Sequence, residues 1–401
     1  MGKPKESSLP SVLFINRVYP PQEGATGQLL AELASQLTEK GWAVTIIASG
    51  EAFAEDHQGL IRVHRVGGLP FNRSSHLKRA FSYLSLYPKF LIAAWREPRH
   101  DLVVTLTDPP LHLVLGPFLK WFKKTKIVHW AQDIYPEIAE ELGVLRKGGL
   151  VANLLRFVSA FSLRRYEAVV TVGRCMKKRL ESRRIPVSRI TVIPNWPLES
   201  SSSQSDPAGA SEFRACHNLN GKFVVMYSGN FGLAHPFEAI VQAVREIAKT
   251  PLIHFVFLGG GPRYEWVREQ CRGMANATFL PYQPIKNLNA SLGAADIHLA
   301  CMEQNLEGLV VPSKIYGIMA AAKPCLFLGP AGSEAAQLIH ELNCGWNLEM
   351  AQFSQLAPIL TKLACNPEPL IAMGQRGYQY TVTHGSTCAA AQFFDLFQKL
   401  T

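Results

Sequence analysis

Short runs of β-branched and other apolar residues alternate with longer amphipathic segments along the first half of the chain. In the segment 26–40, Leu29, Leu33 and Leu37 recur at four-residue spacing, which places them on one face of a helix, and Gly41 follows as a stop signal. The apolar runs predict strands at 11–16, 43–49, 102–107, 126–133, 168–173 and 190–195. Because strands that alternate with helices form a parallel sheet covered on both faces, this half predicts an α/β domain.

The same rhythm restarts after a segment rich in serine, proline and glycine at 197–211. Strands are predicted at 223–229, 253–261, 276–282, 297–301 and 323–330, with a helix at 235–249. A length of 401 residues also suits two domains of roughly 200 residues each. The prediction is two Rossmann-like, doubly wound α/β domains that face each other across a cleft. Their limits are 1–197 for the N-terminal domain, 198–212 for a linker, 213–384 for the C-terminal domain, and 385–401 for a closing helix expected to pack back toward the N-terminal domain.

The basic charge of the chain lies almost entirely in its first half. Residues 1–198 carry 28 Lys and Arg against 16 Asp and Glu, whereas residues 199–401 carry 13 against 15. Three stretches of that half, at 76–96, 118–126 and 157–168, mix basic with aromatic residues. This asymmetry implies an anionic partner, and an anionic membrane surface, a lipid-linked pyrophosphate and nucleic acid all have the required chemistry. The alternative for the three stretches is core helices with solvated lysines.

Several other classes of protein find no support in the sequence. No run of about 18 uncharged apolar residues occurs, and the opening residues have no apolar core or cleavage site, so we expect a cytoplasmic protein. The eight dispersed cysteines form no C-x-x-C pair and are interpreted as reduced thiols. Neither a D-x-D sequence nor a metal-spaced cluster of histidines or carboxylates occurs, so we expect no metal and no other cofactor.

Glycines follow several predicted strands, at the end of the sheet where parallel α/β proteins bind ligands. The loop 19–28 contains Gly24 and Gly27 just before a helix, and an ordinary strand-to-helix turn explains it equally well. A later loop, SGNFG, brackets Asn230 with glycines, and its backbone amides suit a diphosphate. The triple glycine 259–261 permits either a nucleobase or ribose against the backbone or a plain packing turn.

The segment EGLVVPSKIYGIMAAAKP at 307–324 is the most specific stretch of the chain. Pro312 fixes the backbone, Ser313 is expected to cap the following helix, and Lys314 lies in its first turn. A lysine at a helix start opposes the helix dipole, so its presence favours an anion nearby, with an ordinary solvated lysine as the alternative.

Taken together, these motifs resemble the retaining glycosyltransferases of family 4, which have the two-Rossmann architecture called GT-B. The resemblance covers essentially the whole chain and rests on YPPQEGATGQ, WAQDIYPE, TVIPNW, YSGNFG, LGGGP and VVPSKIYGIMAAAKP. WAQDIYPE and PSKIYG are similar to segments of the O-antigen, capsule and colanic-acid subgroup, whose members resemble fucosamine- or fucosyl-transferases. The resemblance implies transfer of a sugar from a UDP- or GDP-linked donor to a lipid-linked saccharide in cell-surface polysaccharide biosynthesis, by a protein peripheral on the inner face of the membrane.

The resemblance also implies a set of site residues. Catalytic roles fall on Asp133, Glu307 and Lys314, with Asp133 near the acceptor hydroxyl and Lys314 near the donor diphosphate. The donor-binding positions are Gly229, Asn230, Gly232, Gly260, Gly261, Glu303, Pro312 and Ser313. The acceptor side of the cleft is expected to hold Pro21, Gly24, Gly27, Glu137 and Asn195, the last of them ending the final strand of its domain. In this family the departing diphosphate is thought to help take the acceptor proton, so Asp133 is expected to position the acceptor, or else to be a simple strand-end cap.

The chain departs from the family pattern at two places. The family commonly has one glutamate for the donor sugar and a second for the ribose, and these positions hold Leu309 and Gly317 here. The two glutamates of the preceding loop are near enough in sequence to serve the sugar, but the ribose contact has no replacement. Asn230 stands where a basic residue is usual, and Lys314 is expected to supply that charge.

Three other functions stay open at this point. A nucleotide-sugar 2-epimerase shares the architecture but has no use for a basic, aromatic first domain. A non-catalytic partner protein that binds a nucleotide sugar is consistent with Gly317. Nucleic-acid binding is suggested by charge alone, and because no recognition motif supports it we do not expect it.

Overall fold

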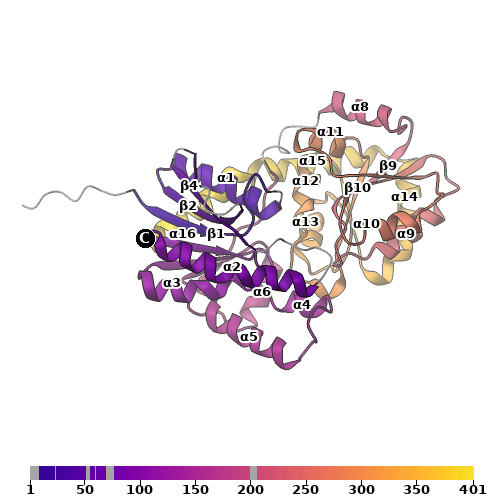
Figure 1. Ribbon diagram of the computed structural model, residues 1–401. Coiled ribbons are helices and arrows are strands. Elements are labelled where there is room, and N and C mark those ends of the chain that lie inside the picture. The colour runs from indigo at the N-terminus through magenta and orange to yellow at the C-terminus, as the bar shows by residue number, and fades with distance from the viewer. Residues whose placement is uncertain (1–8, 23, 51–54, 59, 69–75, 199–205) are drawn as a thin grey trace, which may run out of the picture. The chain divides into compact units, whose positions relative to one another are not determined.

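The computed structural model describes residues 9–22, 24–50, 55–58, 60–68, 76–198 and 206–401 (Figure 1). The chain divides into two compact units, Met1–Pro194 with Thr387–Thr401 as unit 1 and Asn195–Ser386 as unit 2. Each unit contains one sheet whose strands pair mainly in parallel and are joined by helices. The predicted pair of Rossmann-like folds is therefore confirmed.

The sheet of unit 1 has the strand order β3-β4-β2-β1-β5-β6-β7-β8, and only the β3 and β4 pair is antiparallel. Its strands are β1 Ser11–Ile15, β2 Ala43–Ser49, β3 Glu55–Gln58, β4 Ile61–Val66, β5 Leu102–Leu106, β6 Lys126–Ala131, β7 Ala168–Thr171 and β8 Ile190–Val192. The sequence did not predict β3 and β4. The reason is that β4, IRVHRV, alternates apolar with charged residues and lacks the continuous apolar run of the inner strands.

The helices of unit 1 lie on both faces of this sheet. They are α1 Ala25–Glu39, α2 His76–Arg96, α3 Leu115–Lys123, α4 Glu137–Glu141, α5 Leu150–Leu163, α6 Arg174–Glu181 and α16 Ser386–Leu400. Right-handed crossovers place α2, α3, α5 and α6 on one face and α1 on the other, as Figure 1 shows.

The closing helix α16 packs on unit 1 rather than on the unit that precedes it in the chain. The ring of Phe393 lies 4.8 Å from the ring of Trp130 on β6, measured between centroids. Phe397 lies 5.7 Å from Trp42 in the same way and is fully buried. The apolar stripe of α16 thus completes the core of unit 1.

The predicted linker 198–212 is wrong over its second part. Residues 199–205 of it lie outside the described residues, but α8 Pro207–Cys216 begins within it. The Asp206 carboxylate accepts a hydrogen bond from the backbone N–H three residues on, at 2.9 Å, and Pro207 is the first helical residue. An aspartate followed by proline is a helix-start signal, which the serine-rich surroundings concealed.

Replacing Asp206 by alanine is expected to lower the free energy of unfolding by about 1 kcal/mol, because α8 loses its side-chain cap. Asp206→Asn keeps an acceptor in the same place and is the matched control. Urea unfolding followed by circular dichroism measures both variants. An unchanged free energy of unfolding in the alanine variant would show that the cap contributes nothing, and an equal loss in both variants would show that the charge of Asp206 stabilises the helix rather than its hydrogen bond.

The sheet of unit 2 is parallel throughout, with the strand order β11-β10-β9-β12-β13-β14. Its strands are β9 Phe223–Asn230, β10 Ile253–Gly260, β11 Ala277–Leu280, β12 Ile297–Cys301, β13 Cys325–Leu328 and β14 Gly345–Leu348, the last of which the sequence did not predict. Its remaining helices are α9 Phe237–Glu246, α10 Tyr264–Gln270, α11 Leu288–Gly293, α12 Lys314–Ala320, α13 Glu334–Leu342, α14 Leu356–Cys365 and α15 Glu368–Thr383. Among the described helices, none combines the length and the hydropathy that a membrane-spanning segment needs.

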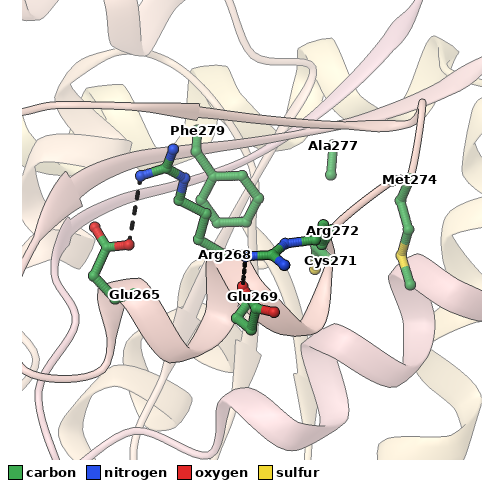
Figure 2. Close-up of a pocket in the computed structure, with 9 residues that line it drawn as sticks. Glu265, Arg268, Glu269, Cys271, Arg272, Met274, Ala277 and Phe279 are labelled. Atoms are coloured by element: carbon green, nitrogen blue, oxygen red, sulfur yellow. Dashed lines mark hydrogen bonds and ion pairs between the residues drawn. The ribbon is translucent and has the colours of Figure 1, made fainter.

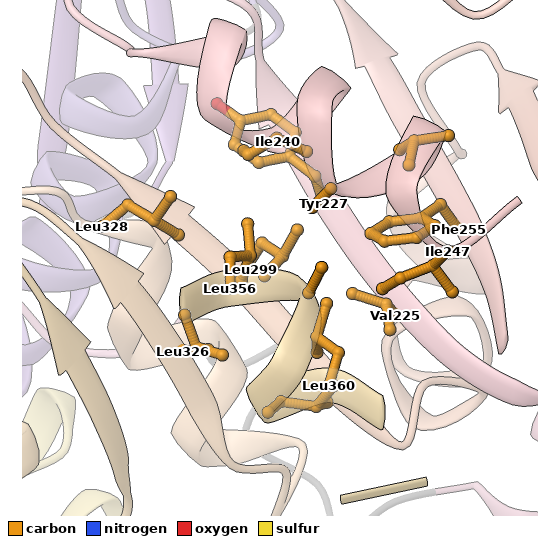
Figure 3. Packing of buried hydrophobic residues seen from close by; sticks show 14 of the residues in the cluster. Val225, Tyr227, Ile240, Ile247, Phe255, Leu299, Leu326, Leu328, Leu356 and Leu360 are labelled. Atoms are coloured by element: carbon orange, nitrogen blue, oxygen red, sulfur yellow. The ribbon is translucent and has the colours of Figure 1, made fainter. Parts of the chain in front are cut away.

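Alternate residues of the central strand β9 enter two different cores. Val225 and Tyr227 belong to the larger core, where Ile240 of α9 and Leu356 and Leu360 of α14 also pack (Figure 3). Val224 and Met226 of β9 point to the opposite face, into a second core that includes Ala210 of α8. A strand buried on both faces reads as a continuous apolar run, which is why β9 was predicted correctly.

Candidate functional site

In unit 1, Asp133 lies two residues beyond β6 in a loop that Thr107 holds. The buried Thr107 hydroxyl, just beyond β5, accepts hydrogen bonds from the backbone N–H groups of Gln132 (2.9 Å) and Asp133 (3.4 Å). Because β6 ends at Ala131, earlier than the predicted strand 126–133, Asp133 stands at the carboxyl edge of the sheet.

The Asp133 carboxyl has an unusual proton affinity. Burial raises its pKa to about 7, and the negative charge of nearby Asp108 raises it in the same direction. The carboxyl is therefore divided between its neutral and charged forms near neutral pH. A group of this kind can accept a hydrogen bond from a hydroxyl or exchange a proton with it.

A bidentate ion pair beside this carboxyl was not foreseen from the sequence. Arg17, just beyond β1, donates from Nε and Nη2 to the two oxygens of Asp108, at 2.8 and 2.7 Å. The backbone N–H of Arg17 also donates to the Asp108 carbonyl at 2.8 Å. The pair joins the loops after β1 and β5, and a charged residue directly after each of two strands was the available signal.

The two glycines of the first loop have a packing reason. A Cβ added to Gly24 would lie 2.7 Å from Cγ1 of Val18, and one added to Gly27 would lie 2.8 Å from the Val18 carbonyl oxygen. The first turn of α1 therefore sits directly on Val18, which supports the strand-to-helix turn weighed above. Contact of Gly24, Gly27 and the exposed Pro21 with an acceptor stays a prediction.

Glu137, assigned to the acceptor side, is engaged inside unit 1. Its carboxylate, 8% exposed, contacts the guanidinium group of Arg183 and lies 3.9 Å from Arg156. Arg156 also pairs with Glu140 at 2.6 Å. This buried network accounts for Glu137 without an acceptor, so its proposed role there has a structural alternative.

Asn195 does not end a strand, which corrects the sequence prediction for it. β8 stops at Val192, because Pro194 has no N–H to extend the ladder. Asn195 is 3% exposed and begins unit 2.

In unit 2, the ends of β9 and β10 meet through glycines. Gly229 pairs with Gly259 and Asn230 with Gly260 in parallel register. A Cβ on Gly259, whose φ is 140°, would lie 2.0 Å from the Gly229 carbonyl oxygen, and one on Gly261 would lie 2.4 Å from Oδ1 of Asn230. Only glycine permits this approach, so the fold brings these predicted donor-binding positions together at one edge.

Lys314, the first residue of α12, reaches the same edge. Its Nζ lies 3.7 Å from the centroid of the Tyr227 ring and donates a hydrogen bond to the Tyr227 hydroxyl. A Cβ on Gly229 would be 3.7 Å from this nitrogen. Burial lowers the pKa of Lys314 to about 8, so the ammonium form dominates at neutral pH.

Ser313 does not cap α12, contrary to the sequence prediction. Its side chain makes no capping hydrogen bond and is exposed, because its own backbone is already helical (φ −61°, ψ −20°) and does not turn the hydroxyl toward the helix start. Pro312 before it is buried.

Sequence reasoning missed His235 and Arg263 at this edge. His235 Nδ1 lies 2.7 Å from the Cys301 carbonyl, and burial together with the Lys314 charge lowers its pKa to about 3, so the ring is neutral. Arg263 donates to the His235 carbonyl at 3.2 Å and pairs with Glu238. The position of Arg263 directly after the triple glycine and Pro262 was the signal.

The two glutamates of the loop after β12 differ in their surroundings. Glu303 is half-buried, its backbone N–H donates to the Ala234 carbonyl at 2.9 Å, and burial raises the pKa of its carboxyl. Glu307 is exposed, with Oε1 2.0 Å from the place that a Cβ on Gly332 would take. Gly232 lies next to His235, because a Cβ added to it would be 3.7 Å from Nε2 of that histidine.

A separate hollow of about 400 Å³ contains none of the predicted site residues (Figure 2). Its lining comes mainly from α10 and β11, with Phe279 and Met274 beside the exposed ion pairs of Arg268 with Glu265 and of Arg272 with Glu269. Exposed pairs of this kind contribute little binding energy, so the glycine-lined edge is the better candidate.

Comparison with known proteins finds similarity to glycosyltransferases. Residues 24–196 match the Glycosyl transferase 4-like domain family. The chain is 30% identical over 63% of its length to WbjE of Pseudomonas aeruginosa, described as a probable glycosyltransferase, and the match spans 63% of that relative's own length. It is 26% identical to WcaI of Escherichia coli, described as a putative colanic acid biosynthesis glycosyl transferase, over 80% of this chain and 83% of the relative.

A solved structure extends the likeness to the whole fold. Anabaena HepE in complex with UDP-glucose superposes with a TM-score of 0.73 at 14% identity, covering 97% of this chain and 99% of that one. At this identity the likeness concerns the fold, which is that of GT-B glycosyltransferases. Residues 24–196 thus match a glycosyl transferase 4-like domain and fall almost entirely in the first of two Rossmann-like units, in a chain similar to glycosyltransferases of which one is described for colanic acid biosynthesis.

Proposed function

We propose that this chain is a retaining glycosyltransferase that moves a sugar from a UDP- or GDP-linked donor to a lipid-linked saccharide in cell-surface polysaccharide biosynthesis, at the cytoplasmic face of the membrane. The observation that carries the proposal is the edge of unit 2, where glycines end β9 and β10 and Nζ of Lys314 lies close to Gly229. Backbone amides with a buried ammonium group are the donors that a diphosphate needs. The named relatives support the same class of reaction.

The polar side chains at this edge are assigned to different parts of the donor. Lys314 and Arg263 supply positive charge, although Asn230 has replaced the usual basic residue. His235 is neutral and donates from Nδ1 to a carbonyl, which leaves Nε2 as an acceptor suited to a sugar hydroxyl rather than to a phosphate.

The chemistry then follows from where charge develops. Departure of the nucleotide places negative charge on the diphosphate, and fixed donors that meet this charge lower the barrier. We assign this task to Lys314 with the glycine loops, and we propose that no metal or other cofactor takes part. Asp133, with its pKa near 7, accepts a hydrogen bond from the acceptor hydroxyl and orients it.

The absence of the family's second glutamate, whose position Gly317 occupies here, favours one alternative function. A Cβ on Gly317 would have only Leu292 Cδ1 nearby, at 4.0 Å, so space for a longer side chain exists and none fills it. Leu309, at the first glutamate position, is fully buried. These substitutions favour a weakened ribose contact, and they are the one observation that keeps a non-catalytic, nucleotide-sugar-binding protein as the second candidate.

The test is to incubate the purified chain with UDP- and GDP-sugars and a polyprenyl-diphosphate saccharide, measuring nucleotide release and lipid-linked product. We expect release that depends on the acceptor, and a product with the anomeric configuration of the donor by NMR. Donor binding without release would favour the non-catalytic protein. Release of a 2-epimerised free sugar without an acceptor would favour the epimerase, and an inverted product would overturn the retaining mechanism.

Replacing Arg263 by glutamine is expected to raise the donor Kd about tenfold, since one of two cations at the donor edge is lost. Arg268→Gln is the matched control, because it removes an arginine from the following helix whose partner Glu265 is exposed. Isothermal titration with the nucleoside diphosphate measures both. If Arg263→Gln binds as the control does, Arg263 serves only its pair with Glu238.

A further inference from the structure

Tyr227 has a hydroxyl group that joins two elements at the edge of unit 2 where β9 and β10 end. The hydroxyl donates a hydrogen bond at 2.9 Å to the carbonyl of Asn230, the last residue of β9. It also accepts a hydrogen bond from Nζ of Lys314, the first residue of α12. The Tyr227 side chain is fully buried. One hydroxyl therefore connects the cation of α12 with the turn at the end of β9.

The charge on Lys314 decides the direction of these two hydrogen bonds. An ammonium group has three donors and no acceptor, so the Tyr227 oxygen accepts from it. The single hydroxyl proton is then left for the Asn230 carbonyl. A hydrogen bond from a charged donor is stronger than a neutral one, and in a buried site it polarises the next bond in the chain. The positive charge of Lys314 thus strengthens the bond from Tyr227 to Asn230.

The aromatic neighbours of Tyr227 keep its hydroxyl in one place. The ring centroids of Phe231 and Phe237 lie 4.7 and 4.9 Å from that of Tyr227, and both contacts are edge to face. The Tyr227 ring belongs to the larger core of unit 2, to which Ile240 also contributes (Figure 3). Nζ of Lys314 lies 3.7 Å from the ring centroid, where a cation is attracted to the ring face. Because turning the ring would disrupt the core, the hydroxyl has a fixed position.

The turn that Tyr227 holds also positions the second cation of this edge. Directly after Asn230, the backbone N–H of Phe231 donates to the Gly260 carbonyl at 2.8 Å. The Phe231 carbonyl accepts from the backbone N–H of Arg263 at 3.0 Å. The backbone of Arg263 is therefore tied to the same turn, and through Tyr227 to the lysine of α12.

We propose that Tyr227 is a positioning residue for donor binding. Its hydroxyl holds the Lys314 ammonium group and the Asn230 turn as one unit, so both cations of this edge are in place before a diphosphate arrives. Fixed donors stabilise negative charge without having to be reordered when the charge develops. Tyr227 is not a catalytic residue, because its only hydroxyl proton is donated to Asn230. Since this role concerns the proposed donor site, it rests on the proposed function.

Other titratable groups face Lys314 from the elements packed around it. They are His235 in the loop after β9, Cys301 of β12 and Cys325 of β13. Burial lowers the pKa of His235 to about 3, raises the pKa of Cys301 to about 12, and raises the pKa of Cys325 as well. The charged groups that face His235 or Cys301 in turn are Arg263, Glu238 and Glu303. Among the groups in contact with Lys314, the charge that changes near pH 8 is that of Lys314 itself.

The first experiment is calorimetric titration of UDP and of GDP into the full chain and into Tyr227→Phe. We expect the Kd of the bound nucleotide to rise about fivefold in the variant, the effect of one buried hydrogen bond. The variant keeps the ring that fills the core, so a cooperative melting transition is expected and is checked. Tyr264→Phe is the matched control, because its ring also packs on Phe231, at 5.1 Å between centroids. The control should bind within twofold of the unchanged chain.

Two further measurements separate positioning of Lys314 from a general loss of packing. In a chain that already carries Lys314→Met, Tyr227→Phe should raise the Kd only about twofold, because only the bond to Asn230 remains to be lost. In Tyr227→Phe alone, the fall of nucleotide affinity with rising pH should begin at least about half a pH unit lower. The reason is that the ammonium form has lost an acceptor that stabilised it. Tyr264→Phe should keep the profile of the unchanged chain.

Hydrogen exchange measured by mass spectrometry gives a readout that needs no ligand. At one fixed pH, the backbone amides of 230–235 and 261–264 should exchange at least about threefold faster in Tyr227→Phe, because the Asn230 turn opens more often without its bond to the hydroxyl. The same amides should exchange at the original rate in Tyr264→Phe. This result depends only on the described contacts and not on any reaction.

Four results would overturn the role of Tyr227. They are a nucleotide Kd of Tyr227→Phe within twofold of the unchanged chain, an equal loss in Tyr264→Phe, a full fivefold loss in the Lys314→Met background, and a fivefold loss with an unchanged pH profile. Failure of the unchanged chain to bind UDP or GDP would instead count against the proposed function. In that case the exchange rates decide alone, and equal rates in Tyr227→Phe and the unchanged chain would remove the positioning role as well.

Discussion

Replacing Lys314 by methionine is expected to lower kcat/KM for the nucleotide sugar by at least about a hundredfold, the loss typical when one preorganised donor to a developing charge is removed. Methionine keeps an unbranched apolar stem of similar length to the lysine methylenes and lacks the ammonium group. That group is buried, donates to Tyr227 and stands over Gly229, so water cannot replace it easily.

Two further variants separate the charge from its surroundings. Lys314→Arg keeps a cation and should recover part of the activity, whereas Tyr227→Phe removes the neighbouring hydroxyl alone and should cost much less than the methionine variant. Steady-state kinetics and donor titration measure all three. Activity of Lys314→Met within twofold of the unchanged chain would remove Lys314 from the mechanism.

The same lysine predicts how donor affinity depends on pH. Burial lowers its pKa to about 8, so the ammonium form is present below that value and disappears as the pH rises through it. Donor affinity should therefore fall above about pH 8 in the unchanged chain. The Lys314→Met variant should show no such fall, because it has no proton to lose.

The sequence predicted most of the fold because inner strands of parallel sheets are apolar on both faces. Strand β9 is an example, since all its residues from Phe223 to Tyr227 are buried. The edge strands of the unit 1 sheet were not predicted, because β4 alternates exposed Arg62 with buried Val63 and resembles a loop in composition. The start of α8 was missed because composition was weighed above the local signal of Asp206 and Pro207.

The sequence predicted those site residues that a single segment identifies, but not those that come together from different loops. Lys314 was singled out because a lysine at a helix start opposes the dipole, and the structure brings it to Gly229. Arg263 and His235 were missed because they meet only when the loops after β9 and β10 lie side by side. That meeting depends on the register of Gly259 with Gly229, which no local pattern encodes.

Replacing Asp133 by alanine is expected to lower kcat/KM by about a hundredfold, because a misplaced acceptor hydroxyl costs about that much. Asp133→Asn keeps an oxygen that accepts a hydrogen bond and should lose less if the side chain only orients the hydroxyl. An asparagine variant as inactive as the alanine one would show that the charge itself is needed. Kinetics with a lipid-linked acceptor at fixed donor measure the two variants.

The raised pKa of Asp133 gives this prediction a second readout that is free of catalysis. Its carboxyl holds a proton up to about pH 7 in the folded chain, whereas an exposed aspartate in the unfolded chain loses it near pH 4. Between these values the folded state binds more protons, so the contribution of Asp133 to stability is complete at low pH and is lost as the pH rises through about 7. The change in the free energy of unfolding caused by Asp133→Asn should therefore be more favourable at pH 8 than at pH 4. The same substitution should lower the activity. A gain in stability together with a loss of activity is expected of a catalytic site that weakens the fold. A carboxylate that only caps the end of a strand would give the opposite stability result, because its loss would destabilise the chain at pH 8.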